Sequence, residues 1–131
     1  MQLGYTILYV DDVPATLDAW IVAFSLSERF RTSEGDYGEL DTGSTTLSFA
    51  EREFGRGHFD DKDVRASFDG RPARFEIGFV TEDVPGAFDH AVNAGMRPVI
   101  EPVTRPWGQV VGWVVDGNGI LVEIASPLDE G

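Results

Sequence analysis

The chain has 131 residues, of which 42% are hydrophobic and 11% aromatic, so it is large enough to bury the core of one ordinary domain. Its formal net charge of −13 opposes binding to nucleic acids and anionic membranes and favours a cationic or neutral ligand, although solubility alone also accounts for it. The chain contains no cysteine, which excludes disulfides, thiolate catalysis and cysteine-ligated zinc.

The first predicted element is a β-strand over residues 5–10, where β-branched and aromatic side chains dominate the run YTILYV. No basic segment precedes this run and no cleavage pattern accompanies it, so we expect no signal peptide. The apolar stretches are too short to span a membrane. These features predict a cytoplasmic protein.

A capped helix is predicted next. The short carboxylate of Asp12 suits an N-cap, because it can accept the free N–H groups of a first helical turn. Pro14 fits in that turn because it has no N–H to leave unsatisfied. Apolar residues then recur with helical spacing at Leu17, Trp20, Ile21 and Phe24.

Three short strands are predicted after this helix, over residues 30–32, 37–41 and 45–50. They complete a first strand–helix–three-strand module over residues 1–50. The polar segment 51–72 follows, and we interpret it as a linker with a helical start over residues 51–54.

The second half of the chain repeats this pattern. Asp12, Val13, Pro14 and Asp18 recur at one constant offset as Asp83, Val84, Pro85 and Asp89, and each copy follows a β-like run. The second helix has apolar positions at Phe88, Ala91 and Val92 and ends at Gly95. Strands are predicted over residues 97–100, 110–115 and 120–125, with a loop over 101–108 and a tight turn over 116–119. Residues 1–131 are therefore interpreted as one domain with a second module over residues 73–127.

A duplicated βαβββ unit in a chain of this size resembles the vicinal oxygen chelate superfamily, which includes glyoxalase I, extradiol dioxygenases, fosfomycin-resistance enzymes and bleomycin-resistance proteins. The resemblance rests on the strings ILYVDDVPATLDAW, FEIGFVTEDVPGAFDHAVNAG and RPWGQVVGWVVDGNGILVEI and on their order. It implies an α+β fold in which the two modules form cupped mixed sheets. It also implies a homodimer in which paired modules hold a small molecule.

Metal-dependent members of this superfamily carry one ligand on the first and last strand of each module. Matched residue by residue, the resemblance puts these positions at Tyr5, Ser48, Glu76 and Glu123. Tyr and Ser are poor ligands for an ordinary divalent ion, so we expect no metal cofactor. The alternative is one divalent metal ion held by Glu76 and Glu123, with His58 from the linker as a further ligand.

Strand alternation predicts which side chains line the cup. Tyr5, Ile7 and Tyr9 alternate with positions suited to packing under the helix. Trp107 lies on a loop and Trp113 within a strand; either can stack on a flat ligand, and either can instead close the core. The predicted ligand-binding set comprises Tyr5, Ile7, Tyr9, Ser48, Glu76, Trp107, Trp113 and Glu123, and no catalytic residue is assigned.

Two charged groups, the Glu76/Glu123 pair and Arg105, also enter the predicted site. Glu76 and Glu123 on one face would raise the pKa of at least one of them by mutual repulsion. Arg105 is expected to neutralise a substrate carboxylate or to pair with one of these glutamates. Each glutamate also has an ordinary structural interpretation as a solvated or Arg-paired residue of a sheet.

Two functional hypotheses follow. The first is a non-catalytic protein that sequesters a cationic or aromatic small molecule, as the resemblance to the bleomycin-resistance branch implies. The alternative is a divalent-metal-dependent lyase, isomerase or epimerase of the glyoxalase type that uses Glu76 and Glu123. Both hypotheses expect a small-molecule partner and a homodimer, and neither expects nucleic acid or a membrane.

Overall fold

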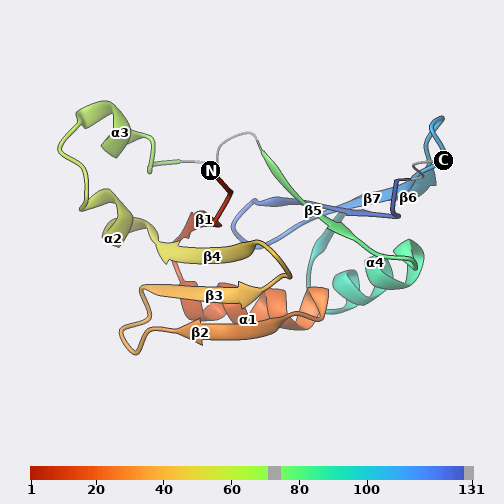
Figure 1. Ribbon diagram of the computed structural model, residues 1–131, viewed down its shortest axis with the longest axis horizontal. Helices are drawn as coiled ribbons and strands as arrows, with labels where there is room; N and C mark the ends of the chain where they lie inside the picture. Colours follow the sequence, from red (N-terminus) through yellow and green to blue (C-terminus); the bar gives the residue numbers. More distant parts are fainter. Residues whose placement is uncertain (71–74, 129–131) are drawn as a thin grey trace. The chain divides into compact units, whose positions relative to one another are not determined.

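The computed structural model describes residues 1–70 and 75–128 and divides into two compact units, Met1–Arg71 and Pro72–Gly131. Each unit contains a four-stranded mixed sheet and an α-helix that packs on it (Figure 1). The predicted α+β fold with two repeated modules is therefore confirmed. The end of the expected linker at residues 71–72 and the start of the second module at residues 73–74 lie outside the described residues.

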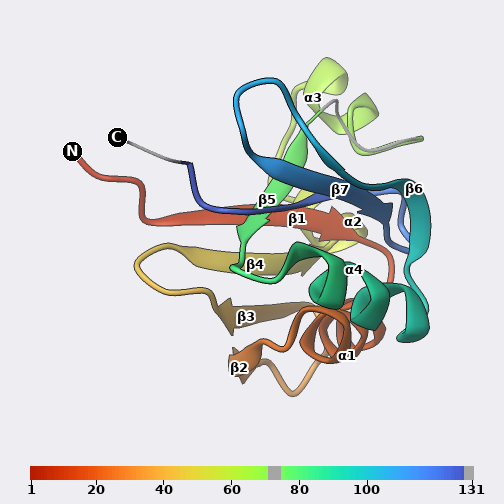
Figure 2. The same ribbon diagram turned by 90° about the vertical axis from the view of Figure 1, so that its right-hand side faces the viewer.

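The first unit starts with β1 (Tyr5–Val10), α1 (Val13–Phe24) and β2 (Ser27–Arg31), followed by β3 (Tyr37–Asp41) and β4 (Thr46–Glu51). The strand order is β1-β4-β3-β2 (Figure 2). β1 runs parallel to β4, and the β4–β3 and β3–β2 pairs are antiparallel. The parallel pair is possible because α1 supplies the long connection that a return in the same direction requires.

The core of the first unit lies between α1 and the sheet. Trp20 and Phe49 are each 0% exposed, and their ring centroids are 5.0 Å apart in an edge-on arrangement. The predicted cap also forms, because the Asp12 carboxylate accepts a hydrogen bond from the Ala15 backbone N–H at 3.0 Å. Local capping and apolar spacing thus fix where α1 begins and which side it buries.

The second unit contains β5 (Glu76–Val80), α4 (Val84–Asn93), β6 (Arg97–Thr104), β7 (Val110–Val115) and β8 (Leu121–Ala125), in the sheet order β5-β8-β7-β6. Asp83 caps α4 as Asp12 caps α1, since its carboxylate accepts from the Gly86 N–H at 3.0 Å. The predicted turn before β8 forms on Asp116, whose carboxylate accepts from the backbone N–H groups of Asn118 and Ile120. Gly119 in this turn has φ +88°, a value that glycine adopts without strain.

Helix and sheet meet in the same way in both units. A Cβ at Gly38 of β3 would lie 2.4 Å from the Leu17 side chain, and a Cβ at Gly112 of β7 would lie 3.1 Å from the ring of Phe88. Leu17 and Phe88 are equivalent residues of the repeat, and both are buried. A glycine in the third strand therefore lets the central helix residue approach the sheet closely in each module.

Two predicted strands are longer in the structure than expected. β2 begins at Ser27 rather than at residue 30, and β6 continues to Thr104, into the loop expected over residues 101–108. Both are edge strands with register shifts. An edge strand tolerates proline and polar residues because one row of its backbone groups needs no ladder partner.

The segment expected to be a linker contains two short helices, α2 (Arg52–Arg56) and α3 (Lys62–Ala66) (Figure 1). The expected helical start over residues 51–54 is therefore close to α2, and α3 was not predicted. Asp61 caps α3 by accepting hydrogen bonds from the backbone N–H groups of Asp63 and Val64. The acidic sequence over residues 60–63 therefore indicates the start of a helix. The longest described helix, α1, has 12 residues, and none of the described helices has the length and hydropathy of a membrane span.

Candidate functional site

Each sheet has one face that packs under its helix and one face that is turned away from it, here called the first and second distal faces. In β1, Leu8 and Val10 are buried under α1, whereas Tyr5 on the distal face is 61% exposed. In β8, Val122 and Ile124 are buried and Glu123 between them is half-buried on the distal face. The alternation predicted from the sequence therefore holds in β1 and around Glu123 in β8.

The second distal face brings Glu76, Trp113 and Glu123 together. Glu123 of β8 lies directly opposite Trp113 of β7 on one side and Gly78 of β5 on the other. The Trp113 indole reaches across β8 and donates a hydrogen bond from Nε1 to Glu76 Oε2 at 2.7 Å. An indole plane and two carboxylates thus share one small area of the second sheet.

Gly78 leaves a gap beside these carboxylates. A Cβ built at this position meets no atom within 4 Å, so the surface above the glycine is open. Glu76 lies two residues before Gly78 on the same side of β5, and Glu123 lies opposite Gly78 on β8. A ligand can therefore approach the backbone of β5 between the two carboxylates.

The electrostatics of this area favour a proton or a cation. Burial raises the pKa of the Glu123 carboxyl, and hydrogen bonding to Glu76 and the charge of Glu76 raise it further. Among the described residues, no Arg or Lys forms an ion pair with either glutamate, since the ion pairs involve Arg31, Arg52 and Arg56 of the first unit. Within the described part of the chain, the two carboxylates therefore have no ion-pair partner.

Arg105 does not pair with Glu76 or Glu123, contrary to one of its expected roles. Its guanidinium carbon instead lies 5.4 Å from the Trp113 ring centroid, within the range of a cation–π interaction. Trp107 is 63% exposed on the loop after β6, and its Nε1 donates to Gln109 Oε1 at 2.9 Å. Trp113, and not Trp107, is thus the tryptophan that contacts the carboxylates.

The other predicted ligand-binding residues, Tyr5, Ile7, Tyr9 and Ser48, lie in the first unit. Ser48 of β4 is 0% exposed, and its hydroxyl is hydrogen-bonded to the Tyr37 hydroxyl at 3.0 Å. Tyr9 packs edge-on against Phe68 at 4.7 Å, and its ring lies so close to Gly55 that a Cβ there would be 2.2 Å away. Tyr5 and Ile7 lie on the first distal face, as the alternation of β1 predicts, opposite Thr46 and Ser48 of β4.

Tyr37 and Glu39 of β3 were missed as candidate residues. The Tyr37 hydroxyl donates to Glu39 Oε2 at 2.6 Å, and Glu39 lies directly opposite Ser48. The alternation of residues 37–41 contained a signal for them, since it assigns both to the side opposite the buried Gly38 and Leu40. That these residues meet Ser48 depends on the β3–β4 register, which no local pattern specifies.

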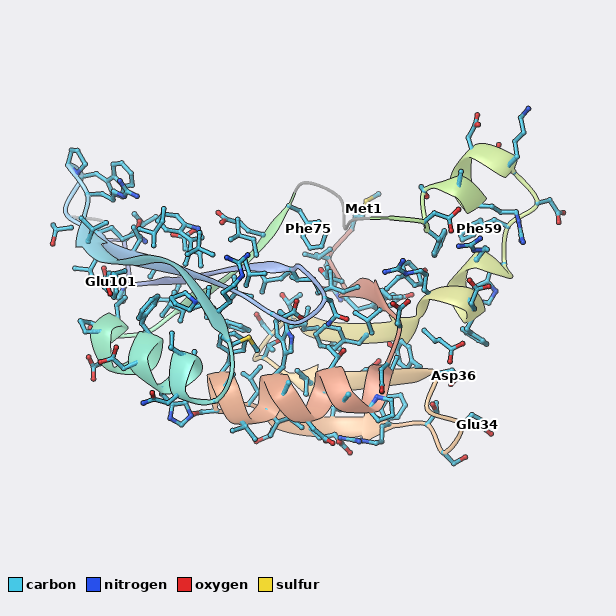
Figure 3. The ribbon with its side chains drawn as sticks, turned by 180° about the vertical axis from the view of Figure 1, so that it is seen from behind. Met1, Glu34, Asp36, Phe59, Phe75 and Glu101 are labelled. Atoms are coloured by element: carbon cyan, nitrogen blue, oxygen red, sulfur yellow. The ribbon has the colours of Figure 1, made fainter. Side chains whose placement is uncertain are left out.

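The donor set at the four superfamily positions does not suit a metal ion. Ser48 is buried and engaged with Tyr37, and Tyr5 supplies only a phenol, so two carboxylates remain. His58 lies in an aromatic cluster, 4.9 Å from Phe54 and 6.3 Å from Phe59 between ring centroids; Figure 3 labels Phe59 in this segment. Within residues 1–70 and 75–128, no group of three or more His, Asp or Glu side chains is arranged to hold a metal.

Comparison with known proteins places this geometry in context. Residues 2–124 match the family model of the Glyoxalase/Bleomycin resistance protein/Dioxygenase superfamily. A sequence comparison with curated proteins gave no match.

Solved structures with the same fold share little sequence with the chain. A glyoxalase/bleomycin resistance protein/dioxygenase family enzyme from Burkholderia phytofirmans PsJN superposes with a TM-score of 0.82 at 18% identity, over 96% of this chain and 98% of the other. A glyoxalase-related enzyme from Fulvimarina pelagi gives 0.82 at 19% identity, over 97% and 88%. TioX from Micromonospora sp. ML1 gives 0.75 at 20% identity, over 96% and 98%. At these identities the likeness shows the fold alone.

Proposed function

Because the chain belongs to the Glyoxalase/Bleomycin resistance protein/Dioxygenase superfamily, we propose that it binds and sequesters a small, flat, cationic molecule on the second distal face. The single observation that carries this proposal is the Glu76–Trp113–Glu123 group. Two carboxylates that form no ion pair with any described Arg or Lys lie beside an indole ring and an open glycine position.

The chemistry of this group suits a cation better than an anion or a neutral molecule. A positive charge on the ligand would neutralise a carboxylate pair whose mutual repulsion is only partly screened, because Glu123 is half-buried. A flat ring would stack on Trp113, where the Arg105 guanidinium already lies at a cation–π distance. Specific recognition by a few polar groups beside an apolar surface is what small-molecule sites require.

The direct test is calorimetric titration of the purified protein at pH 8 with N-methylquinolinium and with quinoline, which has the same ring system without the fixed charge. We expect the cation to bind at least about tenfold more tightly, because it alone can neutralise the carboxylates. A Trp113→Phe variant should lose most of this binding and Trp107→Phe should retain it. Equal binding of both probes, or equal behaviour of both variants, would refute the proposal.

Metal analysis separates this proposal from the alternative, a metal-dependent lyase, isomerase or epimerase. The protein is purified without chelator, incubated with Ni²⁺, Zn²⁺ or Mn²⁺, desalted and analysed for bound metal. We expect substoichiometric metal, because two carboxylates make a weak site for these ions. Near-stoichiometric metal that disappears in a Glu76→Gln variant would replace the sequestration proposal with the enzymatic one.

The oligomeric state and compartment extend the proposal. We propose a homodimer, which the duplicated βαβββ modules and the superfamily membership support. Sedimentation equilibrium at micromolar concentration tests it, and a mass of one 14.4 kDa chain would contradict it. A cytoplasmic location, compatible with the absence of cysteine, is part of the same proposal.

Filling the gap at Gly78 is expected to block the ligand without harming the fold. A Gly78→Val side chain enters open space in a β-strand, so the free energy of unfolding should stay the same or rise by about 0.5–1 kcal/mol. The same isopropyl group would occupy the space between the carboxylates, and affinity for N-methylquinolinium should fall at least about tenfold, the effect of a lost well-packed contact. Gly78→Ala should give an intermediate loss, and an unchanged affinity across this series would place the ligand elsewhere.

Removing Arg105 is expected to strengthen binding of the cation. Its guanidinium competes for the Trp113 ring, and a partly exposed cation–π contact is worth about 0.5–1 kcal/mol, so Arg105→Ala should raise affinity about two- to fivefold. Arg97→Ala removes the same charge from the opposite end of β6 and serves as the control. Weaker binding in Arg105→Ala than in Arg97→Ala would instead assign Arg105 to an anionic part of the ligand.

A further inference from the structure

The first distal face has a row of four side chains that crosses the whole sheet. Ile7 of β1 lies opposite Ser48 of β4, Ser48 lies opposite Glu39 of β3, and Glu39 lies opposite Phe30 of β2. The two inner members of this row are polar and the two outer members are apolar. Residues directly opposite one another on a sheet have neighbouring Cβ atoms, so the four form one continuous strip.

A hydrogen-bond chain holds the polar centre of this strip in place. The Tyr37 hydroxyl donates to Glu39 Oε2 at 2.6 Å and is hydrogen-bonded to Ser48 Oγ at 3.0 Å. Burial raises the pKa of Tyr37, and the hydrogen bond to Glu39 raises it further, so the phenol stays protonated as a donor at neutral pH. Glu39 is thus oriented by a neutral donor, and this donor does not neutralise its negative charge.

The charge of Glu39 has no cationic partner within the described part of the chain. Arg31 of the neighbouring strand β2 pairs with Asp18 and Glu28 at 2.7 and 2.6 Å, and Arg29 of the same strand takes part in no ion pair among the described residues. Arg52 and Arg56 pair with Asp11, Glu53 and Asp69. A carboxylate has about four lone-pair sites, and one phenol satisfies only one of them. A part-buried carboxylate in this state favours a ligand that brings both positive charge and N–H donors.

The flanking side chains indicate what such a ligand carries besides its charge. Phe30 is 45% exposed, although it neighbours Glu39, and its ring centroid lies 5.8 Å from that of Tyr37. Ile7 is half-buried on the opposite side of Ser48. An aromatic or aliphatic substituent could bury apolar surface against either residue while an ammonium group meets Glu39.

We propose that Glu39, Tyr37 and Ser48 form a second binding site, selective for a primary ammonium group with an apolar substituent. Glu39 accepts N–H donors of the ammonium, Tyr37 and Ser48 hold the carboxylate in place, and Phe30 contacts the substituent. All of these residues belong to the first unit. This second site goes beyond the proposed sequestration of a flat cation, because it selects for hydrogen-bonding ammonium groups.

The test uses the full chain with Glu76→Gln/Glu123→Gln substitutions, so that binding at the second distal face is disabled. Calorimetric titration with benzylammonium, benzyl alcohol and benzyltrimethylammonium compares charge and N–H donors on one apolar group. We expect benzylammonium to bind best, because it alone offers both charge and donors, with a preference of about tenfold for a charge-assisted hydrogen bond. A benzylammonium affinity equal to that of benzyl alcohol would overturn the proposal.

Glu39→Gln, added to the same background, should weaken benzylammonium at least about tenfold, since the amide keeps the size of the side chain but loses its charge. Glu34→Gln, in the exposed β2–β3 loop labelled in Figure 3, is the matched control and should leave binding unchanged. Equal affinities of these two variants would overturn the proposal even if the parent binds benzylammonium.

Tyr37→Phe provides a second variant if Glu39→Gln lowers the thermal midpoint too far to be tested. It keeps the carboxylate and removes its orienting donor, so benzylammonium affinity should fall about threefold while the preference over benzyl alcohol remains. The neutral alcohol should be unaffected by this substitution. A Tyr37→Phe variant with unchanged benzylammonium affinity would show that the hydrogen-bond chain only stabilises the sheet.

Discussion

The Glu76→Gln/Glu123→Gln variant is expected to bind N-methylquinolinium about 100-fold more weakly than the wild type, because it loses two charge interactions of about 1.5 kcal/mol each. Glutamine keeps the size of each side chain and an oxygen that can accept from Trp113, so the second sheet should remain intact. Calorimetric titration at pH 8 measures the loss.

The control for this prediction removes two other charges from the same unit. Glu82→Gln/Glu101→Gln changes exposed carboxylates outside the Glu76–Trp113–Glu123 group, and Figure 3 labels Glu101. It removes the same number of negative charges as the Glu76→Gln/Glu123→Gln variant. It should reduce the affinity for the cation by less than about threefold, because exposed charges are strongly screened. A comparable loss in both double variants would mean that the cation responds only to the overall charge of the protein.

The same pair of glutamates predicts a pH dependence. The pKa of Glu123 is raised in the folded protein, by burial first and by Glu76 second. As pH falls through this raised value Glu123 takes up a proton, so affinity for the cation should fall in the same window in the wild type. The affinity of Glu76→Gln/Glu123→Gln should be flat there, and a parallel decline in both proteins would assign the titration to another group.

The raised pKa of Glu123 affects the stability of the fold in the opposite direction: stability falls as pH rises, whereas affinity for the cation falls as pH falls. A carboxyl whose pKa is higher in the folded than in the unfolded state binds more protons when folded, so it stabilises the fold at low pH and loses that contribution as pH rises between the two values. Glu123→Gln removes the ionisable group, so the folded state no longer loses stability as pH rises through this range. Its free energy of unfolding at pH 8 should therefore equal or exceed that of the wild type, as urea denaturation can measure.

Trp20→Ala is expected to have the largest effect on stability, a loss of about 3–5 kcal/mol in the free energy of unfolding, as for other buried aromatic-to-alanine changes. Trp20 is 0% exposed, and its ring contacts Phe24 and Phe49 at centroid distances of 5.1 and 5.0 Å. Alanine would leave a cavity between α1 and the first sheet that the surrounding strands can only partly close.

Urea denaturation followed by far-UV circular dichroism measures this loss. Trp107→Ala removes an indole that is 63% exposed and should change the free energy of unfolding by less than about 0.5–1 kcal/mol, which separates packing from the mere loss of an aromatic residue. A Trp20→Ala effect below about 1 kcal/mol would contradict the assignment of this residue to the core.

Sequence alone was sufficient wherever the signal is local. The caps at Asp12 and Asp83 and the strands Tyr37–Asp41 and Val110–Val115 have the predicted positions, because a cap and a period of two depend on neighbouring residues only. The repeat supplied the remaining architecture, since two copies of one pattern imply two similar units. α3 was missed because the polar segment 51–72 was interpreted as a linker, although Asp61 is a good N-cap.

Edge strands were the other limit of local reasoning. The second half of β6 contains Pro102 and was predicted as part of a loop, and the polar residues 27–29 at the start of β2 were not predicted as strand. Only their position at the sheet edge explains why they form strands, because there one row of N–H groups needs no partner. Position in a sheet is decided by tertiary pairing and leaves little trace in the local sequence.

For the candidate sites, alternation along the strands predicted which way the side chains of Glu76 and Glu123 point but left Trp113 ambiguous. It did not predict which residues of other strands they contact. The hydrogen bond from Trp113 to Glu76 and the chain from Ser48 through Tyr37 to Glu39 join residues on different strands. Such contacts depend on strand order and register, and shifting a register by one residue would turn each side chain to the other face. Residue chemistry and facing were thus determined by the sequence, whereas the tertiary structure decided which of these groups meet.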